Sequence, residues 1–218
     1  MAKKLNVTPR KQALQSRSRE TVDVILEATA RILVKEGYDR TSTNKIAQAA
    51  GVSIGSLYQY FPNKEALVAA VITKHTDAMM ELIRSTALRV AQLPLEASAR
   101  ELVRVMIEAH GIAPKLHRVL TEQTPRVGKT AYMEKVDDEA IRLVRAYLEI
   151  HRDELCVDDL DLAAFIAVTT VEALTHAAVL RQPDLLAQPH FVDEVTSVVF
   201  RYLSVPDGKS RKRTRLSA

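Results

Sequence analysis

The sequence predicts an all-α protein, with a three-helix N-terminal helix-turn-helix domain and a C-terminal domain of about six helices. Aliphatic residues and alanine are abundant, whereas only six glycines and no tryptophan occur among the 218 residues, a composition typical of helical proteins. Apolar residues recur at helical spacing in segments that proline or glycine separates. Between Thr41 and Glu65, two short helices are expected around a tight turn.

The first helix is expected over about residues 18–36, where apolar residues share one face and Gly37 ends the helix. Ser42 or Thr43 caps the second helix, because a hydroxyl oxygen accepts hydrogen bonds from unpaired backbone N–H groups. Gly51 supplies the positive φ that a sharp helix exit needs.

The third helix is expected over 54–61, with Ser53 as its cap and Pro62 as its stop. Leu57 and Phe61, four residues apart, are expected to face inward. The side chains left to face outward are those of Ser56, Gln59 and Tyr60, with Tyr58 beside them. Two helices joined in this way form a helix-turn-helix, whose second helix enters a DNA major groove.

Six further helices are expected over about residues 64–90, 96–110, 115–123, 129–151, 158–181 and 189–203. The helix over 158–181, which Asp158 is expected to cap, is apolar nearly all round, and this indicates burial on most sides. A small domain alone can hardly cover both this helix and the last one, so we infer a homodimer packed through the two. Two reading helices related by a two-fold axis suit a palindromic operator.

Net charge differs between parts of the chain. Residues 1–65 carry a net charge of +5, residues 66–204 carry −5, and residues 205–218 carry +4. A basic N-terminal region beside an acidic one is typical of a protein that holds DNA at one end. We expect residues 1–17 to form a disordered basic arm, which either reaches DNA or stays solvated. The last segment is expected to be a disordered basic tail that adds DNA affinity or solubility.

Many residues in and around the motif match one known family in order and spacing. They are Ile25 to Thr29, Leu33, Gly37, Tyr38, Thr41, Ser42, Ile46, Ala47, Ala50 to Ser53, Gly55, Leu57, Tyr58, Tyr60, Phe61, Lys64 and Leu67. In these residues the chain resembles the TetR (tetracycline-repressor-like) family of bacterial transcription regulators, over roughly residues 18–70. The resemblance implies a DNA-binding domain over 18–65 and a helical ligand-binding and dimerisation domain over 66–204.

The resemblance also implies which side chains meet DNA. Those expected to face the major groove are Ser53, Ile54, Gly55, Ser56 and Gln59, and those expected to touch phosphates are Thr43, Tyr58, Tyr60 and Lys64. Glutamine pairs bidentately with adenine, and isoleucine methyls suit a thymine methyl, whereas hydroxyls and lysine suit phosphate oxygens. The alternative for Tyr58 and Tyr60 is a place in the core.

Lys45 departs from the family pattern, in which an acidic residue often stands three positions after the cap. A lysine loses that capping interaction and brings positive charge to a positive helix end. We interpret it as an additional phosphate contact.

A regulatory ligand is expected in an apolar cavity among the middle helices, with a few polar groups. The candidate polar groups are His110, His117, Glu122, Tyr132, Glu172 and His176. Glu172 and His176 lie one helical turn apart and can share a hydrogen bond, so they are either ligand contacts or a structural pair at the dimer seam. For His110 and His117, near helix ends, the alternative is surface capping.

The function expected is therefore that of a ligand-responsive repressor, which binds its operator as a dimer and is released by an unknown small-molecule inducer. The alternative is an architectural or ligand-independent DNA-binding protein. An enzyme is not expected, because the sequence contains no nucleophile elbow, glycine-rich phosphate loop or metal motif. No cofactor and no metal are expected.

The sequence also indicates the cellular compartment of the protein. Cys156 is the only cysteine, which excludes an internal disulfide and indicates a reducing cytoplasm. No run of 18 consecutive apolar residues and no signal peptide are apparent, so neither a membrane span nor export is expected.

Overall fold

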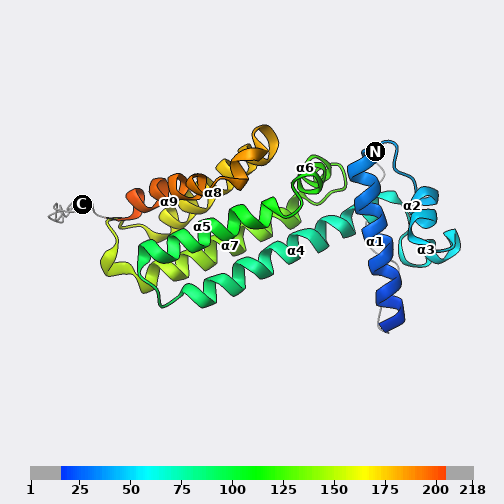
Figure 1. Ribbon diagram of the computed structural model, residues 1–218. Coiled ribbons are helices and arrows are strands. Elements are labelled where there is room, and N and C mark those ends of the chain that lie inside the picture. The colour runs from blue at the N-terminus through cyan, green and yellow to red at the C-terminus, as the bar shows by residue number, and fades with distance from the viewer. Residues whose placement is uncertain (1–15, 205–218) are drawn as a thin grey trace, which may run out of the picture. The chain divides into compact units, whose positions relative to one another are not determined.

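The computed structural model describes residues 16–204, and within this range it contains nine α-helices and two short 3-10 helices (Figure 1). The α-helices are α1 (Ser16–Glu36), α2 (Thr43–Ala50), α3 (Ile54–Tyr60), α4 (Lys64–Val90), α5 (Leu95–Gly111), α6 (Pro114–Gln123), α7 (Thr130–Ile150), α8 (Leu160–Arg181) and α9 (Pro189–Leu203). The 3-10 helices are η1 (Arg152–Glu154) and η2 (Pro183–Ala187). The all-α prediction is confirmed. The predicted tail and nearly all of the predicted arm lie outside the described residues.

The helices form two compact units. Of the described residues, 16–78 and 113–135 belong to the first unit, and 79–112 and 136–204 to the second. The helices α4 and α7 contribute residues to both units. This division differs from the domain boundary expected after residue 65, because the first half of α4 and all of α6 pack with the helix-turn-helix.

The first unit has its own core beneath the helix-turn-helix. Ile25 of α1, Ile46 of α2, Leu57 of α3 and Leu67 of α4 are fully buried and join one apolar cluster, to which Leu120 of α6 also belongs. Burial of several aliphatic side chains contributes about 1.5–3 kcal/mol each, which holds together helices too short to be stable alone.

Local caps set the bounds of the two short helices in this unit. The Ser42 hydroxyl accepts a hydrogen bond from the Lys45 backbone N–H at 3.4 Å, so Ser42 rather than Thr43 caps α2. Gly51 ends α2 with φ 66°, in the left-handed region as predicted. The Ser53 hydroxyl accepts from the Ser56 backbone N–H at 3.0 Å and caps α3.

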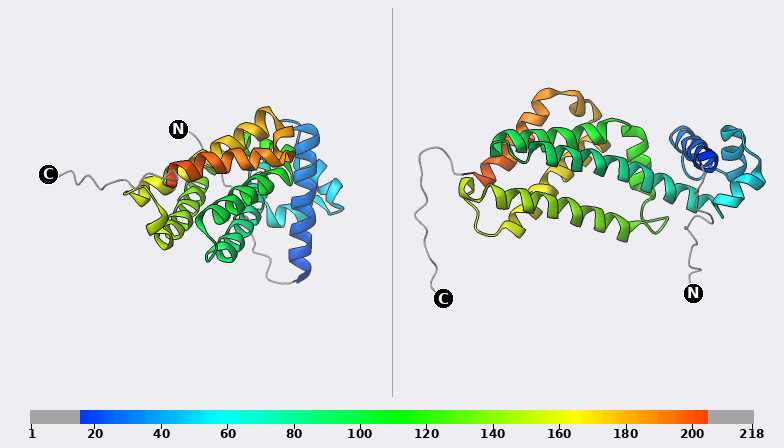
Figure 2. Two further views of the ribbon diagram at one scale, coloured as in Figure 1. Left: turned by 60° about the vertical axis from the view of Figure 1, so that its left-hand side comes forward. Right: turned by 90° about the horizontal axis from the view of Figure 1, so that it is seen from below.

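In the second unit α5, α8 and α9 lie side by side (Figure 2). Their shared core includes Val103 and Ile107 of α5, Ala163 and Ala167 of α8, and Val199 of α9. Asp159, not the predicted Asp158, caps α8, because its carboxylate is the one that accepts from the Leu162 backbone N–H, at 3.0 Å.

The helix α8 is apolar on more than the face that it buries. It is long and apolar enough to cross a membrane, but core helices pass the same test and 44% of its apolar window is buried. The opposite side exposes Leu162 and Phe165, each at 52% of its surface. The helix thus carries one apolar face in the core of the second unit and another that no described part of the chain covers.

Candidate functional site

The first candidate site is the exposed side of α3. Ile54 and Tyr58 are 40% and 39% exposed, and Gly55 and Gln59 are also exposed. Ser53 stands exposed at the helix start. The side of α3 expected to read DNA is therefore open to solvent within the first unit.

Tyr60 is the exception, and the expectation that it faces outward is wrong. Its side chain is 9% exposed and belongs to the core of the first unit with Leu57 and Phe61. The physical reason is the helical period, since residues three and four positions after Leu57 lie on the same face as Leu57.

Two pairs of hydroxyl groups order this exposed side. The Ser53 and Ser56 hydroxyl oxygens are 2.8 Å apart, and the Thr43 and Tyr58 hydroxyl oxygens are 3.0 Å apart. The second pair joins the start of α2 to α3. Both pairs reduce the rotational freedom of polar side chains that stand at the surface, which lowers the entropic cost of binding.

Gly55 has no structural reason to be a glycine. Its φ is not positive, and the nearest heavy atom to an added Cβ is the Ser53 hydroxyl oxygen at 3.8 Å, an ordinary contact. Alanine therefore fits the fold of the chain at this position. A glycine here suits close approach of something outside the chain.

Lys45 has a partner within the first unit. Its ammonium donates to the Glu36 carboxylate at 2.5 Å and to the Arg40 carbonyl oxygen at 3.0 Å. The hydrogen bond from Lys45 also lowers the pKa of Glu36. This lysine joins α2 to the end of α1, a role that the sequence analysis missed and that differs from the expected phosphate contact.

Lys64 lies in a cluster around Tyr38. Its ammonium donates to the Tyr38 carbonyl oxygen at 3.0 Å and lies 4.1 Å from the centre of the Tyr38 ring, while the Arg126 guanidinium lies 4.3 Å from that centre. The Tyr38 hydroxyl donates to the Glu65 carboxylate at 3.0 Å. Burial, together with this hydrogen bond, raises the pKa of Tyr38 to about 12, so it stays a donor at neutral pH.

Three of the predicted ligand residues belong to the first unit. His117 is buried on α6, and its Nδ1 lies 3.1 Å from Nε2 of His75 on α4. Glu122 is exposed and forms an ion pair with Arg118 at 3.3 Å. The Tyr132 hydroxyl donates to the Asp77 carboxylate at 2.7 Å.

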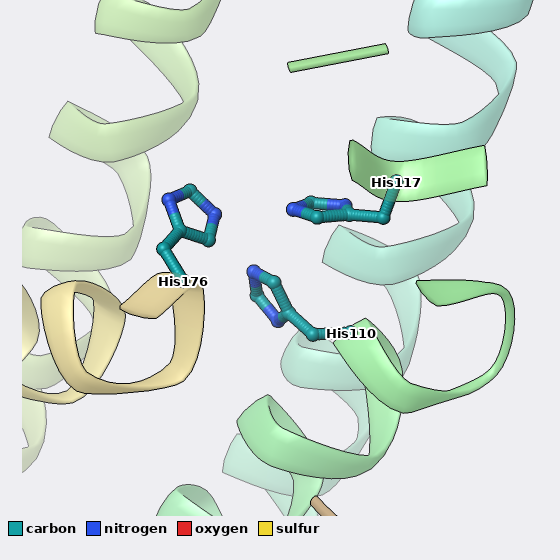
Figure 3. A group of neighbouring side chains, drawn as sticks. All are labelled: His110, His117 and His176. Carbon is teal, nitrogen blue, oxygen red and sulfur yellow. The ribbon is translucent and has the colours of Figure 1, made fainter. Parts of the chain in front are cut away.

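The other three belong to the second unit. His110, 4% exposed on α5, donates through Nδ1 to the Met106 carbonyl oxygen at 2.7 Å. Its ring centre lies 5.0 Å from that of His176 on α8 (Figure 3). Glu172 is half-buried, and burial raises its pKa. No hydrogen bond joins Glu172 to His176 among the described residues, so the pair expected there is not formed.

The second unit also contains an apolar cavity, and none of the predicted ligand residues lines it. The cavity has a volume of about 80 Å³, within an outline of about 780 Å³ that includes open solvent, and α4, α5, α7, α8 and α9 line it. Tyr147 of α7 contributes to this lining, and its buried hydroxyl forms no hydrogen bond within the described residues. Burial raises the pKa of Tyr147, and the neighbouring Ser98 lowers it by less.

Comparison with known proteins identifies the chain. A family model described as the tetracyclin repressor-like C-terminal domain matches residues 94–203. A second model, described as bacterial regulatory proteins of the tetR family, matches residues 25–71. The chain belongs to the TetR family. The predicted family is thus confirmed, and TetR proteins are transcriptional regulators.

Among curated relatives, the uncharacterized HTH-type transcriptional regulator YvkB of Bacillus subtilis (strain 168) is 37% identical over 68 residues, which are 31% of this chain and 36% of that protein. The nucleoid occlusion factor SlmA of Glaesserella parasuis serovar 5 (strain SH0165) is 25% identical over 111 residues, 51% of this chain and 52% of that protein. The chain spans about a third to a half of the length of the curated relatives that it matches.

Solved structures share the fold. A TetR-family regulator from Mesorhizobium loti MAFF303099 is 21% identical, with a TM-score of 0.71 over 88% of this chain and 100% of that chain. SmeT of Stenotrophomonas maltophilia in complex with triclosan is 22% identical, with a TM-score of 0.64 over 86% of this chain and 93% of that chain. At these identities the likeness concerns the fold alone.

We predict that acid destabilises the protein partly through His75. Burial lowers the pKa of His75, so the unfolded chain, with a histidine pKa of about 6.5, binds a proton more readily than the folded one. Stability is then fully present above about pH 6.5 and is lost as pH falls toward the lowered folded pKa. The measurement is the midpoint of urea unfolding at pH 7.5 and pH 5.5.

The substitution His75→Gln is expected to reduce the loss of stability between these two pH values, since glutamine does not titrate. His190→Gln, at an exposed position on α9, serves as the control and leaves the loss unchanged. Equal losses in the wild type and His75→Gln would contradict the prediction.

Proposed function

We propose that this TetR-family protein is a cytoplasmic, homodimeric repressor that reads a palindromic operator through α3 and is released by an apolar small molecule. The observation that carries the proposal is the exposed side of α3, where Gly55 lacks any structural reason within the chain. The reading residues are Ser53, Ile54, Gly55, Ser56 and Gln59, with Thr43, Tyr58 and Lys64 at phosphates. Tyr60 is left out because it is buried.

The chemistry of this side suits DNA. Gln59 offers a donor and an acceptor that match adenine in the major groove, and Ile54 offers methyl groups for a thymine methyl. The hydroxyls of Thr43 and Tyr58 are 3.0 Å apart, and whichever of the two accepts from the other keeps its own proton to donate to a phosphate oxygen. The ammonium of Lys64 adds positive charge, although part of its hydrogen-bonding capacity is used by Tyr38.

The outward stripe of α8 supports the homodimer. Leu162, Phe165, Thr169, Ala173 and Leu180 are exposed, and their spacing places them on one side of the helix. Val198 of α9 is 52% exposed as well. Apolar patches of this kind on a soluble protein mark interaction sites, and a second copy of the same two helices gives a closed, symmetric contact.

The cavity of the second unit supports an apolar ligand. Its lining is aliphatic apart from Met106 and Tyr147, and the buried Tyr147 hydroxyl, which has no hydrogen-bond partner among the described residues, is the candidate polar group to orient a ligand. SmeT, which shares the fold, is known in complex with triclosan, an instance of a small-molecule complex in a TetR-like structure. The six polar residues expected from the sequence are not part of this proposal for the cavity.

The helix α4 is the proposed link between ligand and DNA. It begins at Lys64, contributes residues to both units, and lines the cavity through Ile83 and Ala87. A ligand that favours one position of this helix changes the spacing of the two reading helices in a dimer. Release then requires that the ligand bind the two arrangements with different affinity.

A ligand-independent DNA-binding protein is the second candidate function. It is favoured by the match to SlmA, whose name describes a nucleoid occlusion factor. Selection of bound sequences from random DNA separates the two, since a repressor selects a palindrome that apolar ligands displace.

We predict that Gly55→Ala folds normally and loses operator affinity. One misplaced methyl in a close contact costs about 1–3 kcal/mol, so roughly tenfold weaker binding or more is expected in fluorescence anisotropy with the selected DNA. Gly111→Ala is the matched control, because this glycine also has open space around an added Cβ but lies far along the chain from α3. Unchanged affinity of Gly55→Ala would remove the proposed reading side.

We predict that Phe165→Glu combined with Val198→Glu converts the dimer to a monomer, because two charged groups cannot be buried unpaired in an apolar contact. The mass is measured by size-exclusion chromatography with light scattering. Leu88→Glu, at a position 81% exposed on α4, is expected to leave the dimer intact. A dimer that persists in the double variant would place the contact elsewhere.

We predict that filling the cavity abolishes binding of an apolar fluorescent probe, 8-anilinonaphthalene-1-sulfonate. In Ala99→Phe a ring replaces a methyl that lines the cavity, whereas Ala97→Phe adds the same ring at an exposed position of the same helix. The probe's fluorescence enhancement is expected in the wild type and Ala97→Phe and to be lost in Ala99→Phe. Equal enhancement in all three proteins would show that the probe binds outside the cavity.

A further inference from the structure

The start of α2 is tied to the end of α1 by one lysine. Lys45 lies in the first turn of α2, and its ammonium donates to the Glu36 carboxylate at 2.5 Å and to the Arg40 carbonyl oxygen at 3.0 Å. Glu36 is the last residue of α1, and Arg40 belongs to the segment that leads from α1 to α2. Figure 1 shows this segment turning the chain between the two helices. One side chain therefore joins three successive parts of the first unit.

The connecting segment, residues 37–42, is also held from α4. The Lys64 ammonium at the start of α4 donates to the Tyr38 carbonyl oxygen at 3.0 Å. This contact reaches the first half of the segment, whereas Lys45 reaches Arg40 in the second half, from which α2 begins. The two lysines thus hold the segment at different points, and Lys45 is the one next to the start of α2.

Lys45 occupies the position where a capping box has an acidic residue, three after the cap Ser42. An acidic side chain there accepts from a backbone N–H at the helix start, whereas an ammonium only donates. Positive charge at this end of a helix is unfavourable by itself. The Glu36 carboxylate compensates for that charge, and the hydrogen bond from Lys45 lowers the pKa of Glu36, so the pair is ionised at neutral pH. The chain thus replaces a contact within α2 by one between α2 and α1.

The proposed phosphate contacts begin two residues before Lys45. Thr43 is the first residue of α2, and its hydroxyl lies 3.0 Å from that of Tyr58 on α3. A displacement of the start of α2 moves Thr43 directly and changes its pairing with Tyr58. Phosphate contacts fix the register and orientation of a protein on the duplex, so the position of this helix start bears on how α3 enters the groove.

We propose that Lys45 is a positioning residue for DNA binding, which acts through Glu36 and the Arg40 carbonyl group. It holds the start of α2 where the Thr43 and Tyr58 hydroxyls meet phosphates. The inference rests on the proposed reading of DNA by α3. If Lys45 only bound phosphate, Glu36 would compete with DNA for its ammonium, and removal of Glu36 would strengthen binding. In the positioning role, loss of either partner weakens binding.

The test measures the affinity of Lys45→Met, Glu36→Ala and the double variant for DNA selected from random sequences, by fluorescence anisotropy at about 0.15 M salt. Each single variant is expected to bind about two- to tenfold more weakly than the wild type, in the range of an exposed ion pair with an added charge-assisted hydrogen bond. The double variant is expected to bind no more weakly than Lys45→Met, because both substitutions remove the same tie. Unchanged or tighter binding by Glu36→Ala would overturn the proposal.

Lys74 and Asp23 provide the matched controls. Their ion pair joins α4 to α1 within the same unit at 2.6 Å, and the side chains of Lys74 and Lys45 are 49% and 48% exposed. Lys74→Met and Asp23→Ala therefore remove the same kinds of charge without touching the link between α1 and α2. Both are expected to bind DNA within about twofold of the wild type. A loss in Asp23→Ala equal to that in Glu36→Ala would count against a specific role of Lys45.

Hydrogen exchange without DNA separates this inference from the proposed function. The Ile46 backbone N–H donates to the Ser42 carbonyl oxygen at 3.0 Å, at the start of α2. Its exchange is expected to be faster in Lys45→Met and Glu36→Ala than in the wild type and the two control variants, because the helix start opens more readily. Unchanged exchange would overturn the tie. Faster exchange in a protein that selects no DNA would contradict the proposed function and leave the tie supported.

Discussion

The buried side of α3 is the constraint on which the rest of the first unit depends. A helix of seven residues has no stability of its own, and it is held in place by Leu57, Tyr60 and Phe61 in the core. Because these side chains occupy one side completely, the opposite side is left to Ile54, Gly55, Tyr58 and Gln59. The direction in which the chain can read another molecule is therefore decided by apolar packing, not by the polar residues themselves.

The cluster around Tyr38 holds the elements that surround α3. The Tyr38 ring contacts cations from two places, Lys64 at the start of α4 and Arg126 after α6, and its hydroxyl donates to Glu65. Arg126 also forms an ion pair with Asp39 at 3.0 Å. Each exposed ion pair contributes little, but cation–π contacts with a partly desolvated ring add about 1 kcal/mol. Through these contacts, α6 and its following loop belong to the same unit as the helix-turn-helix.

Much of this was predictable from the sequence, for physical reasons that differ between elements. Helix bounds followed from caps and breakers that act locally, such as Gly51 and Ser53, and the family followed from the order of residues in the motif. The outward placement of Tyr60 is wrong because Tyr60 stands three residues after Leu57, on the face that Leu57 buries. The partners of Lys45 and the position of Tyr147 depend on contacts between helices, which hydrophobic periodicity does not describe.

In the helix α8, polar side chains carry information that the apolar residues do not. When a helix is apolar nearly all round, periodicity does not distinguish its core face from its exposed face, and polar side chains are the remaining markers. The Thr175 hydroxyl donates a hydrogen bond to the Val171 carbonyl oxygen at 2.7 Å, so its hydrogen-bonding requirement is met within the helix. The Glu172 carboxylate cannot form the same hydrogen bond, because an ionised carboxylate only accepts and cannot donate to a carbonyl oxygen. Glu172 is half-buried, and burial raises its pKa, so this position carries a desolvation cost that Thr175 avoids.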